Sequence, residues 1–404
     1  MAEKKTGRSK QIKTAIILAG IFFIIGIILQ LIFGYFPFKA IQFPVNIIIF
    51  IELLVLLPLI WVVFKKRKTV QRLSSPVAAL SSITFFTILV IIMAIIPQGG
   101  HLNRIGFTQV TDSMMFALSV VFLTLTLGFT TIRRLSPFSK RNFIFFLNHF
   151  GLWIVITAGS LGQADKQEVM IYCPTDQLVW YGTNSEHQKI ELPFALELRE
   201  FILKEYSPKL ALINSSGELM KVRGNQLKQI NQPALFTIDT FQIQVESYYP
   251  EAFVRPDTIL NVRGIRGAGP AARVKIDMPS GKSARGWIAP YSAKSRTRIL
   301  KLSPEASLIL LPPEPAYYGA HIKLYTQSGI QGEGRLIEVN QPIRTEGWKI
   351  YLQNYDISGE QDICTFIAVK DPWLPLVYAG LLMMCAGSAG LIFISPRSLI
   401  RTRL

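Results

Sequence analysis

Six long runs of apolar residues alternate with shorter polar segments along the chain. A helix needs about 20 apolar residues to cross the hydrocarbon core of a bilayer, and each run meets or approaches that length. The pattern predicts six transmembrane helices, at Thr14–Phe36, Val45–Phe64, Val77–Ile96, Met114–Ile132, Phe143–Gly162 and Trp373–Ile394. We interpret the first run as a retained anchor and not a signal peptide, because it is too long and no small-residue cleavage site follows it.

A different pattern fills the segment 163–371, between the fifth and sixth runs. Short stretches there alternate apolar and polar residues and are bounded by Gly, Pro, Asn or Ser, which is typical of strands. The clearest of these stretches are 210–222, 235–249, 272–281 and 346–359. The proline-rich stretch 301–319 is expected to be irregular. We therefore expect one large, mainly β domain inserted between helices five and six.

These elements divide the chain into a membrane part and an extracytoplasmic part. The domains in chain order are a basic tail (1–13), an N-terminal hairpin (14–64), three core helices (77–162), the β domain (163–371), the last helix (373–394) and a second tail (395–404). The predicted fold class is a six-helix membrane protein with a large, mainly β extracytoplasmic domain.

Composition and charge support this assignment. Half of the residues are apolar and only 17% are charged, which is too hydrophobic for an ordinary soluble enzyme. The net charge of +17 would suit a nucleic-acid binder, but the excess Lys and Arg lie in the two tails and in the gaps after helices two and four. The β domain is nearly neutral. By the positive-inside rule, both termini are cytoplasmic and the β domain faces the outer, periplasmic side of the inner membrane.

Two ionisable residues lie inside the predicted helices. Glu52 is expected to be protonated or paired, because a free charge is costly at that depth. His149 lies about 9 Å along its helix from Phe143, at 1.5 Å per residue. Its imidazole can coordinate iron through one nitrogen and form a hydrogen bond through the other. Trp153, four residues on, shares its face and could line a flat apolar pocket. The alternative is a histidine that forms a hydrogen bond between helices.

The outer domain offers fewer chemical signals. The sequence has no Walker, GxSxG, HExxH or paired CxxC motif, so we nominate no catalytic residue. Cys173 and Cys364, near the two membrane junctions of the domain, either form a disulfide or remain free thiols. The basic segment 255–301 is either a solvated face or a dock for an acidic partner or for ligand carboxylates.

Four segments resemble, in order, the ResB (also called CcsB) family of cytochrome c biogenesis proteins. The segment "FFLNHFGLWIVITAGSLGQAD" resembles the family helix with an HxGL…GxLG pattern. The others are "IGFTQVTDSMMFALSVVFLTLTLGFTTIRRL", "ELPFALELREFILKEYSP", and "GWKIYLQNYDIS" with "VKDPWLPLVYAGLLMMCAG". The resemblance covers residues 77–404. The hairpin 14–64 departs from it, since the usual family core has four helices.

The resemblance implies a function in the System II pathway. Family members work with a tryptophan-rich membrane protein, ResC or CcsA, and the complex carries haem outward and attaches it to apocytochrome c. This chain would be a non-catalytic or co-catalytic subunit that binds haem b transiently. The family's haem-ligand histidine maps onto His149, which would be the iron ligand. Two further residues complete the candidate haem-binding set. They are Trp153, on the same helix as His149, and His101, in the outer loop between helices three and four. The alternative function is a membrane scaffold whose outer domain docks a partner without contacting haem.

Overall fold

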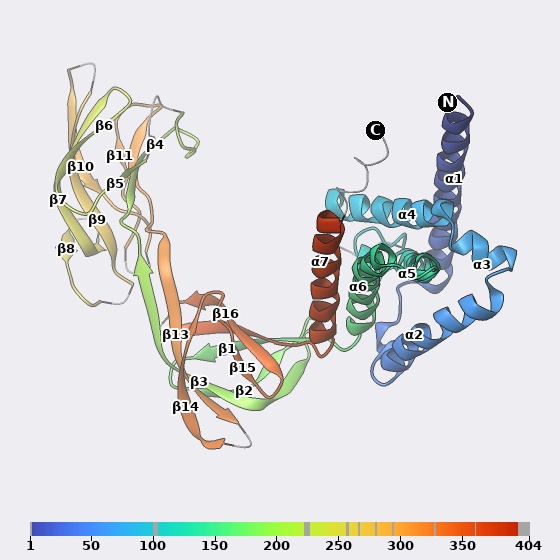
Figure 1. Ribbon diagram of the computed structural model, residues 1–404. Helices are drawn as coiled ribbons and strands as arrows, with labels where there is room; N and C mark the ends of the chain where they lie inside the picture. Colours follow the sequence, from blue (N-terminus) through green and yellow to red (C-terminus); the bar gives the residue numbers. More distant parts are fainter. Residues whose placement is uncertain are drawn as a thin grey trace. The chain divides into compact units, whose positions relative to one another are not determined.

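The chain folds into two compact units, which Figure 1 shows as a helical part and a β part. The computed structural model describes residues 2–99, 104–221, 227–255, 258–265, 267–278, 281–292, 295–326, 329–359 and 361–394. The first unit comprises Met1–Lys166 with Asp371–Leu404, and the second comprises Gln167–Lys370. The expected insertion of a β domain between two helices is thus present in the chain order.

In its described residues, the helical unit contains six helices that are long and apolar enough to cross a membrane. They are α1 (Ala2–Phe33), α2 (Val45–Phe64), α4 (Pro76–Ile95), α5 (Met114–Leu135), α6 (Lys140–Gly162) and α7 (Leu374–Ile394). The prediction of six such helices is confirmed. The sequence pattern missed α3 (Lys68–Leu73), a short polar helix whose Val70 packs into the helical core, and two single turns, η1 (Phe38–Ile41) and η2 (Val110–Asp112).

Local chemistry sets several of these helix ends. Ser75, Ser113 and Ser139 precede α4, α5 and α6, and each hydroxyl accepts a hydrogen bond from the backbone N–H three residues on. Serine is a favoured N-cap because it satisfies one of the first free N–H groups of a helix. Helix α1 ends at Phe33, and the next residue, Gly34, has a φ of 73°, the left-handed conformation that commonly stops a helix. The predicted helix ends three residues too late for this reason.

Helices α6 and α7 pack backbone against backbone. A Cβ added at Gly151 would lie 2.5 Å from the carbonyl oxygen of Gly380, and one added at Gly387 would overlap the backbone of Asn148. Asn148 Nδ2 also donates hydrogen bonds to Met384 O at 3.0 Å and Ser388 Oγ at 2.6 Å. Small residues permit such close approach between membrane helices, and polar side chains then join them. This close packing fixes the position of α6 against α7.

The described strands of the β unit form three antiparallel sheets. The largest has the order β14-β13-β3-β2-β1-β17-β16-β15. Its strands are β1 (Gln167–Pro174), β2 (Leu178–Thr183), β3 (Lys189–Glu205), β13 (Pro315–Thr326), β14 (Gly329–Glu338), β15 (Ile343–Thr345), β16 (Trp348–Asp356) and β17 (Ile363–Lys370). The second sheet contains β6 (Ala234–Ile238), β7 (Phe241–Val254), β8 (Ile259–Asn261), β9 (Gly269–Asp277) and β10 (Ser283–Ile288). The third contains β4 (Lys209–Ile213), β5 (Lys228–Gln229), β11 (Leu300–Lys301) and β12 (Ser307–Leu310).

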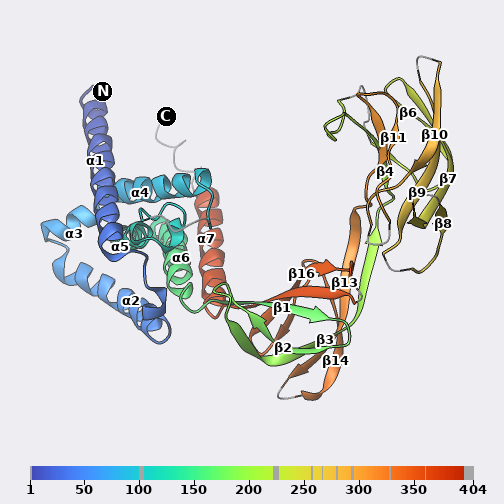
Figure 2. The ribbon, with the colours of Figure 1, turned by 180° about the vertical axis from the view of Figure 1, so that it is seen from behind.

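Two large hydrophobic cores and a smaller one around Val254 and Ala271 stabilise the described part of this unit. One large core lies on the large sheet, around Ile171, Leu196 and Phe366. The other large core lies between the two smaller sheets, around Ile243 and Ile276. The long strands β3 and β13 pair with each other and lie side by side in Figures 1 and 2, where they lead from the large sheet towards the smaller sheets.

The expectation that 301–319 is irregular is wrong in part. This stretch contains β12 and the start of β13. Its prolines do not interrupt these strands, because Pro312 and Pro313 lie between the two strands and Pro315 is the first residue of β13. A proline at the first position of a strand removes no necessary hydrogen bond from the sheet.

Candidate functional site

His149 lies on α6, half-buried, one turn after Phe145. The two rings stack with their centroids 3.7 Å apart and an interplanar angle of 21°. His149 Nδ1 lies 3.0 Å from the backbone carbonyl oxygen of Phe145. A carbonyl only accepts hydrogen bonds, so Nδ1 carries the hydrogen and the neutral ring keeps its lone pair on Nε2. A backbone hydrogen bond at one ring nitrogen is the usual way to orient a histidine whose other nitrogen binds a metal.

A cation lies near the same aromatic ring. The guanidinium carbon of Arg134, at the end of α5, is 5.5 Å from the centroid of the Phe145 ring. Such cation–π contacts hold an arginine near an aromatic face while leaving its N–H groups available to an anion. Sequence reasoning did not place Arg134 in the site. The paired arginines at the end of α5 could have pointed to this site. Their proximity to Phe145, however, depends on how α5 and α6 pack against each other.

Trp153 lies in the core of the helical unit. Its side chain is only 2% exposed, and its Nε1 donates a hydrogen bond to the carbonyl oxygen of Thr124 at 3.1 Å. The indole ring stacks on Phe150 with an interplanar angle of 7° and packs against Phe50. The structure therefore does not give Trp153 the open face that a shared pocket with His149 requires. The third candidate, His101, lies outside the described residues.

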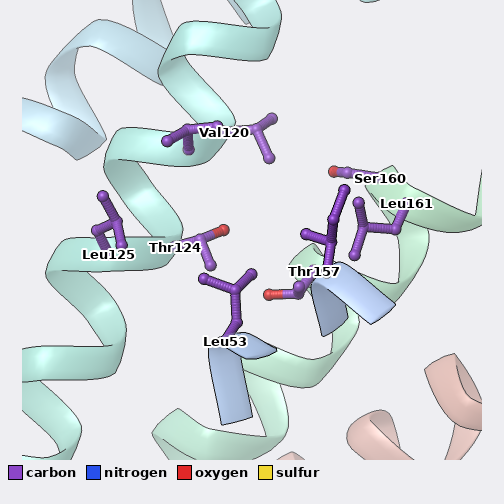
Figure 3. Close-up of a pocket in the computed structure, with 9 residues that line it drawn as sticks. Leu53, Val120, Thr124, Leu125, Thr157, Ser160 and Leu161 are labelled. Carbon is purple, nitrogen blue, oxygen red and sulfur yellow. The ribbon is translucent and has the colours of Figure 1, made fainter. Parts of the chain in front are cut away.

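One apolar cavity of about 250 Å³ lies between α2, α5 and α6. Figure 3 shows the hydroxyl groups of Thr124 on α5 and Thr157 on α6 directed into the space between the helices. Both hydroxyls are buried and have no hydrogen-bond partner within the described part of the chain. Neither His149 nor Trp153 lines this cavity. Pockets for drug-sized ligands occupy about 300–1,000 Å³, so this cavity is too small for haem.

A second polar cluster surrounds Asp165, just after the end of α6. Its carboxylate accepts hydrogen bonds of 2.8 Å from Phe43 N, Asn46 Nδ2 and Trp373 Nε1. Burial raises the pKa of the Asp165 carboxyl, but the hydrogen bonds from Asn46, Phe43 and Trp373 outweigh it and the net shift is downward. The cluster joins the beginning of α2, the end of α6 and the beginning of α7. It is structural, and the sequence pattern gave no sign of it.

Cys173 and Cys364 lie directly opposite each other on β1 and β17. Both are fully buried free thiols in the structure. Burial raises the pKa of the Cys173 thiol to about 11 and that of the Cys364 thiol to about 12. Since the thiolate is the reactive form, neither residue is activated for nucleophilic or metal chemistry.

The basic segment 255–301 has part of its charge neutralised by nearby acids. Glu246 Oε2 lies 2.8 Å from Arg285 Nε and 3.5 Å from Arg273 Nε, and Lys275 Nζ lies 3.6 Å from Asp277 Oδ1. Among the described residues, no group of three or more His, Cys, Asp or Glu side chains could hold a metal ion. The described part of this segment is therefore mainly a solvated face on which basic and acidic side chains form ion pairs.

Comparison of the chain with models of known protein families finds no match. A search of curated proteins finds no similar sequence.

Proposed function

We propose that the chain is a ResB-like subunit of a System II cytochrome c synthase. In this role it helps to carry haem across the membrane and presents it for attachment to apocytochrome c. The observation that carries the proposal is the geometry of His149. Its Nδ1 is held by the Phe145 carbonyl, and its Nε2 retains a lone pair on a half-buried ring.

The proposal places all six apolar helices across the bilayer. Both termini and the short gaps 65–75 and 136–139 are cytoplasmic, and the β unit is on the outer side. The basic residues Lys65, Lys66, Arg133 and Arg134 lie at the ends of α2 and α5, which the proposed topology assigns to the cytoplasmic side. Positively charged residues are enriched on that side of membrane proteins, which supports this orientation.

Haem is the cargo in this proposal. His149 Nε2 would supply a nitrogen ligand to the haem iron, and the guanidinium of Arg134 would suit a haem carboxylate. The cavity lined by Thr124 does not reach His149, and Trp153 is packed into the core. We therefore assign the rest of the haem environment to a ResC- or CcsA-type partner.

A direct test compares haem absorbance in the purified full-length chain, alone and copurified with a tryptophan-rich membrane partner. The proposal expects a haem Soret band in the copurified complex, in stoichiometric proportion to this chain. A complex that matures cytochromes c but whose haem resides wholly on the partner would reject the assignment of His149 as a ligand.

The second candidate function is a scaffold that binds a partner through its outer unit without touching haem. The burial of Trp153 favours it, because that residue cannot flank haem without opening the helical core. The scaffold predicts that haem content follows the partner alone. Substitutions at His149 would then leave the haem bound per partner molecule unchanged.

A further inference from the structure

Glu52 is the most deeply placed charged residue in the six apolar helices. It is the eighth residue of α2, about 10 Å along the helix from Val45 at 1.5 Å per residue. The other charged residues of the candidate spans lie close to helix ends: Lys13, Arg133, Arg134, Lys140 and Arg141. A carboxyl at this depth needs a specific reason.

The Glu52 side chain lies on the exposed face of α2. Phe50 and Leu57 are buried on the opposite face, which packs into the helical core. At 100° per residue, Glu52 projects from the side facing away from these residues. Its neighbours on that exposed face are the apolar side chains Ile48, Val55, Leu56 and Leu59. Within the described residues, Glu52 has no hydrogen bond or ion pair.

Lipid alone does not satisfy this carboxyl. A polar group in hydrocarbon requires an internal partner because no water competes there. Long Lys and Arg side chains reach the interface from inside a bilayer, but the short Glu side chain does not. The missing hydrogen-bond donor must therefore come from another transmembrane segment.

Charge identifies the class of that segment. In a two-fold contact between copies of this chain, the same surface meets itself and two carboxyls face each other. A copy in any other arrangement offers no Lys or Arg at comparable depth, because these residues lie near the ends of its spans. Its one histidine inside the described spans, His149, is half-buried, stacked on Phe145 and bonded through Nδ1 to the Phe145 carbonyl. We propose that the face of α2 formed by Ile48, Glu52, Val55 and Leu59 docks a transmembrane helix of a different protein. That helix carries a Lys, Arg or His at the depth of Glu52.

This inference requires α2 to span the bilayer but does not depend on haem binding. The test places the photocrosslinker benzoylphenylalanine at Val55 of the full-length chain in its native membrane. The matched control places it at Ile83, the eighth residue of α4. The two native side chains are similarly exposed, at 58% and 53%. We expect one protein adduct at Val55, absent at Ile83, whose crosslinked peptide is a transmembrane segment with a basic residue.

A substitution then tests the charge itself. In the chain with the crosslinker at Val55, Glu52→Leu should lower the adduct at least tenfold at equal chain abundance. Glu52→Gln should retain part of it, because the amide still accepts a hydrogen bond. Exchanging the charges, with Glu52→Lys and the partner's basic residue changed to Glu, should restore the adduct. An undiminished adduct in Glu52→Leu, an adduct between two copies of this chain, or crosslinking to lipid alone would each overturn the proposal.

Discussion

Trp373 donates a hydrogen bond from its indole Nε1 to Oδ2 of Asp165, over 2.8 Å. The two residues lie far apart in the sequence, at the two points where the chain passes between its helical and β units. The same carboxylate binds Asn46 Nδ2, so one acidic group connects α2, α6 and α7. These hydrogen bonds hold together the ends of the three helices next to the two chain connections to the β unit.

Asp165→Ala should destabilise the helical unit. The substitution removes the acceptor of three hydrogen bonds, and a partly buried donor left without a partner costs about 1–3 kcal/mol. We expect a lower midpoint of thermal unfolding in detergent micelles. Trp373→Phe serves as the milder comparison, because it removes one donor and leaves the other two bonds to Asp165. An Asp165→Ala chain as stable as wild type would show that solvent replaces these bonds without loss.

The same carboxyl should make stability depend on pH in a defined window. Its folded-state pKa is depressed below the unfolded value. The contribution to stability is therefore complete above an unfolded pKa of about 3.9 and is lost as pH falls through the lower folded pKa. Comparing thermal midpoints of wild type and Asp165→Asn between neutral and acid pH measures this term. The difference between the two chains should shrink below the unfolded pKa, and a constant difference would contradict the assignment.

The sequence sufficed for the helices because length and apolar composition alone specify them. It missed α3 because a six-residue polar helix has no such pattern, and Val70 finds its place only through packing. Alternation indicated β structure in residues 163–371 but not the pairing of β3 with β13, which joins residues more than 100 positions apart. Trp153 was placed by helix periodicity on the face of His149, whereas its hydrogen bond to Thr124 holds it in the core. Contacts between segments that are distant in the sequence cannot be predicted from the local pattern of residues.

Gly387→Ala should weaken the contact between α6 and α7. An added Cβ would overlap the backbone of Asn148, which cannot move as a flexible side chain can. Overpacking of this kind typically costs about 1–3 kcal/mol. Gly159→Ala is the matched control on α6, because its Cβ would meet no atom within 4 Å. Thermal unfolding should show a loss for Gly387→Ala and none for Gly159→Ala. Equal midpoints for both variants would mean that the helices are not packed this closely.

The buried thiols of Cys173 and Cys364 should resist alkylation in the folded protein. Their pKa values, raised to about 11 and about 12, keep them protonated at neutral pH. A water-soluble maleimide should therefore label neither residue before denaturation and both residues after it, even without a reductant. Mass spectrometry of peptides from β1 and β17 counts the labels. Two cysteines that stay unlabelled after denaturation, until a reductant is added, would show that they form a disulfide in the cell.

Arg134→Gln should weaken haem retention by the complex with the partner, if this guanidinium binds a haem carboxylate. Exposed ion pairs contribute about 0.2–1 kcal/mol, so the expected loss in affinity is modest, at most about fivefold. Arg141→Gln is the control, because Arg141 is also an exposed basic residue at the same end of the helical unit. Titration of haem into the purified complex distinguishes them. A loss of the same size in both variants would indicate a general effect of positive charge.

His149→Ala is the sharpest test of the proposed function. A ligand histidine and a structural histidine lead to different results, because only the ligand binds iron through Nε2. If His149 is a ligand, its loss should deplete haem from the purified complex and reduce cytochrome c assembly at an unchanged protein level. Added imidazole should then restore part of both, since a free ligand can enter the vacated space.

A structural His149 predicts the opposite pattern. The ring then contributes only packing on Phe145 and one hydrogen bond within α6, and a typical intramolecular hydrogen bond is worth about 0.5–1.5 kcal/mol. Among the described residues, the structure does not show the hydrogen bond between helices that was the alternative for this histidine. Haem content would follow protein abundance, and imidazole would have no effect. His321→Ala controls for the loss of a histidine, because His321 is exposed on β13 in the β unit. A His149→Ala complex with full haem and normal cytochrome assembly removes the ligand role, and the scaffold function then accounts better for the chain.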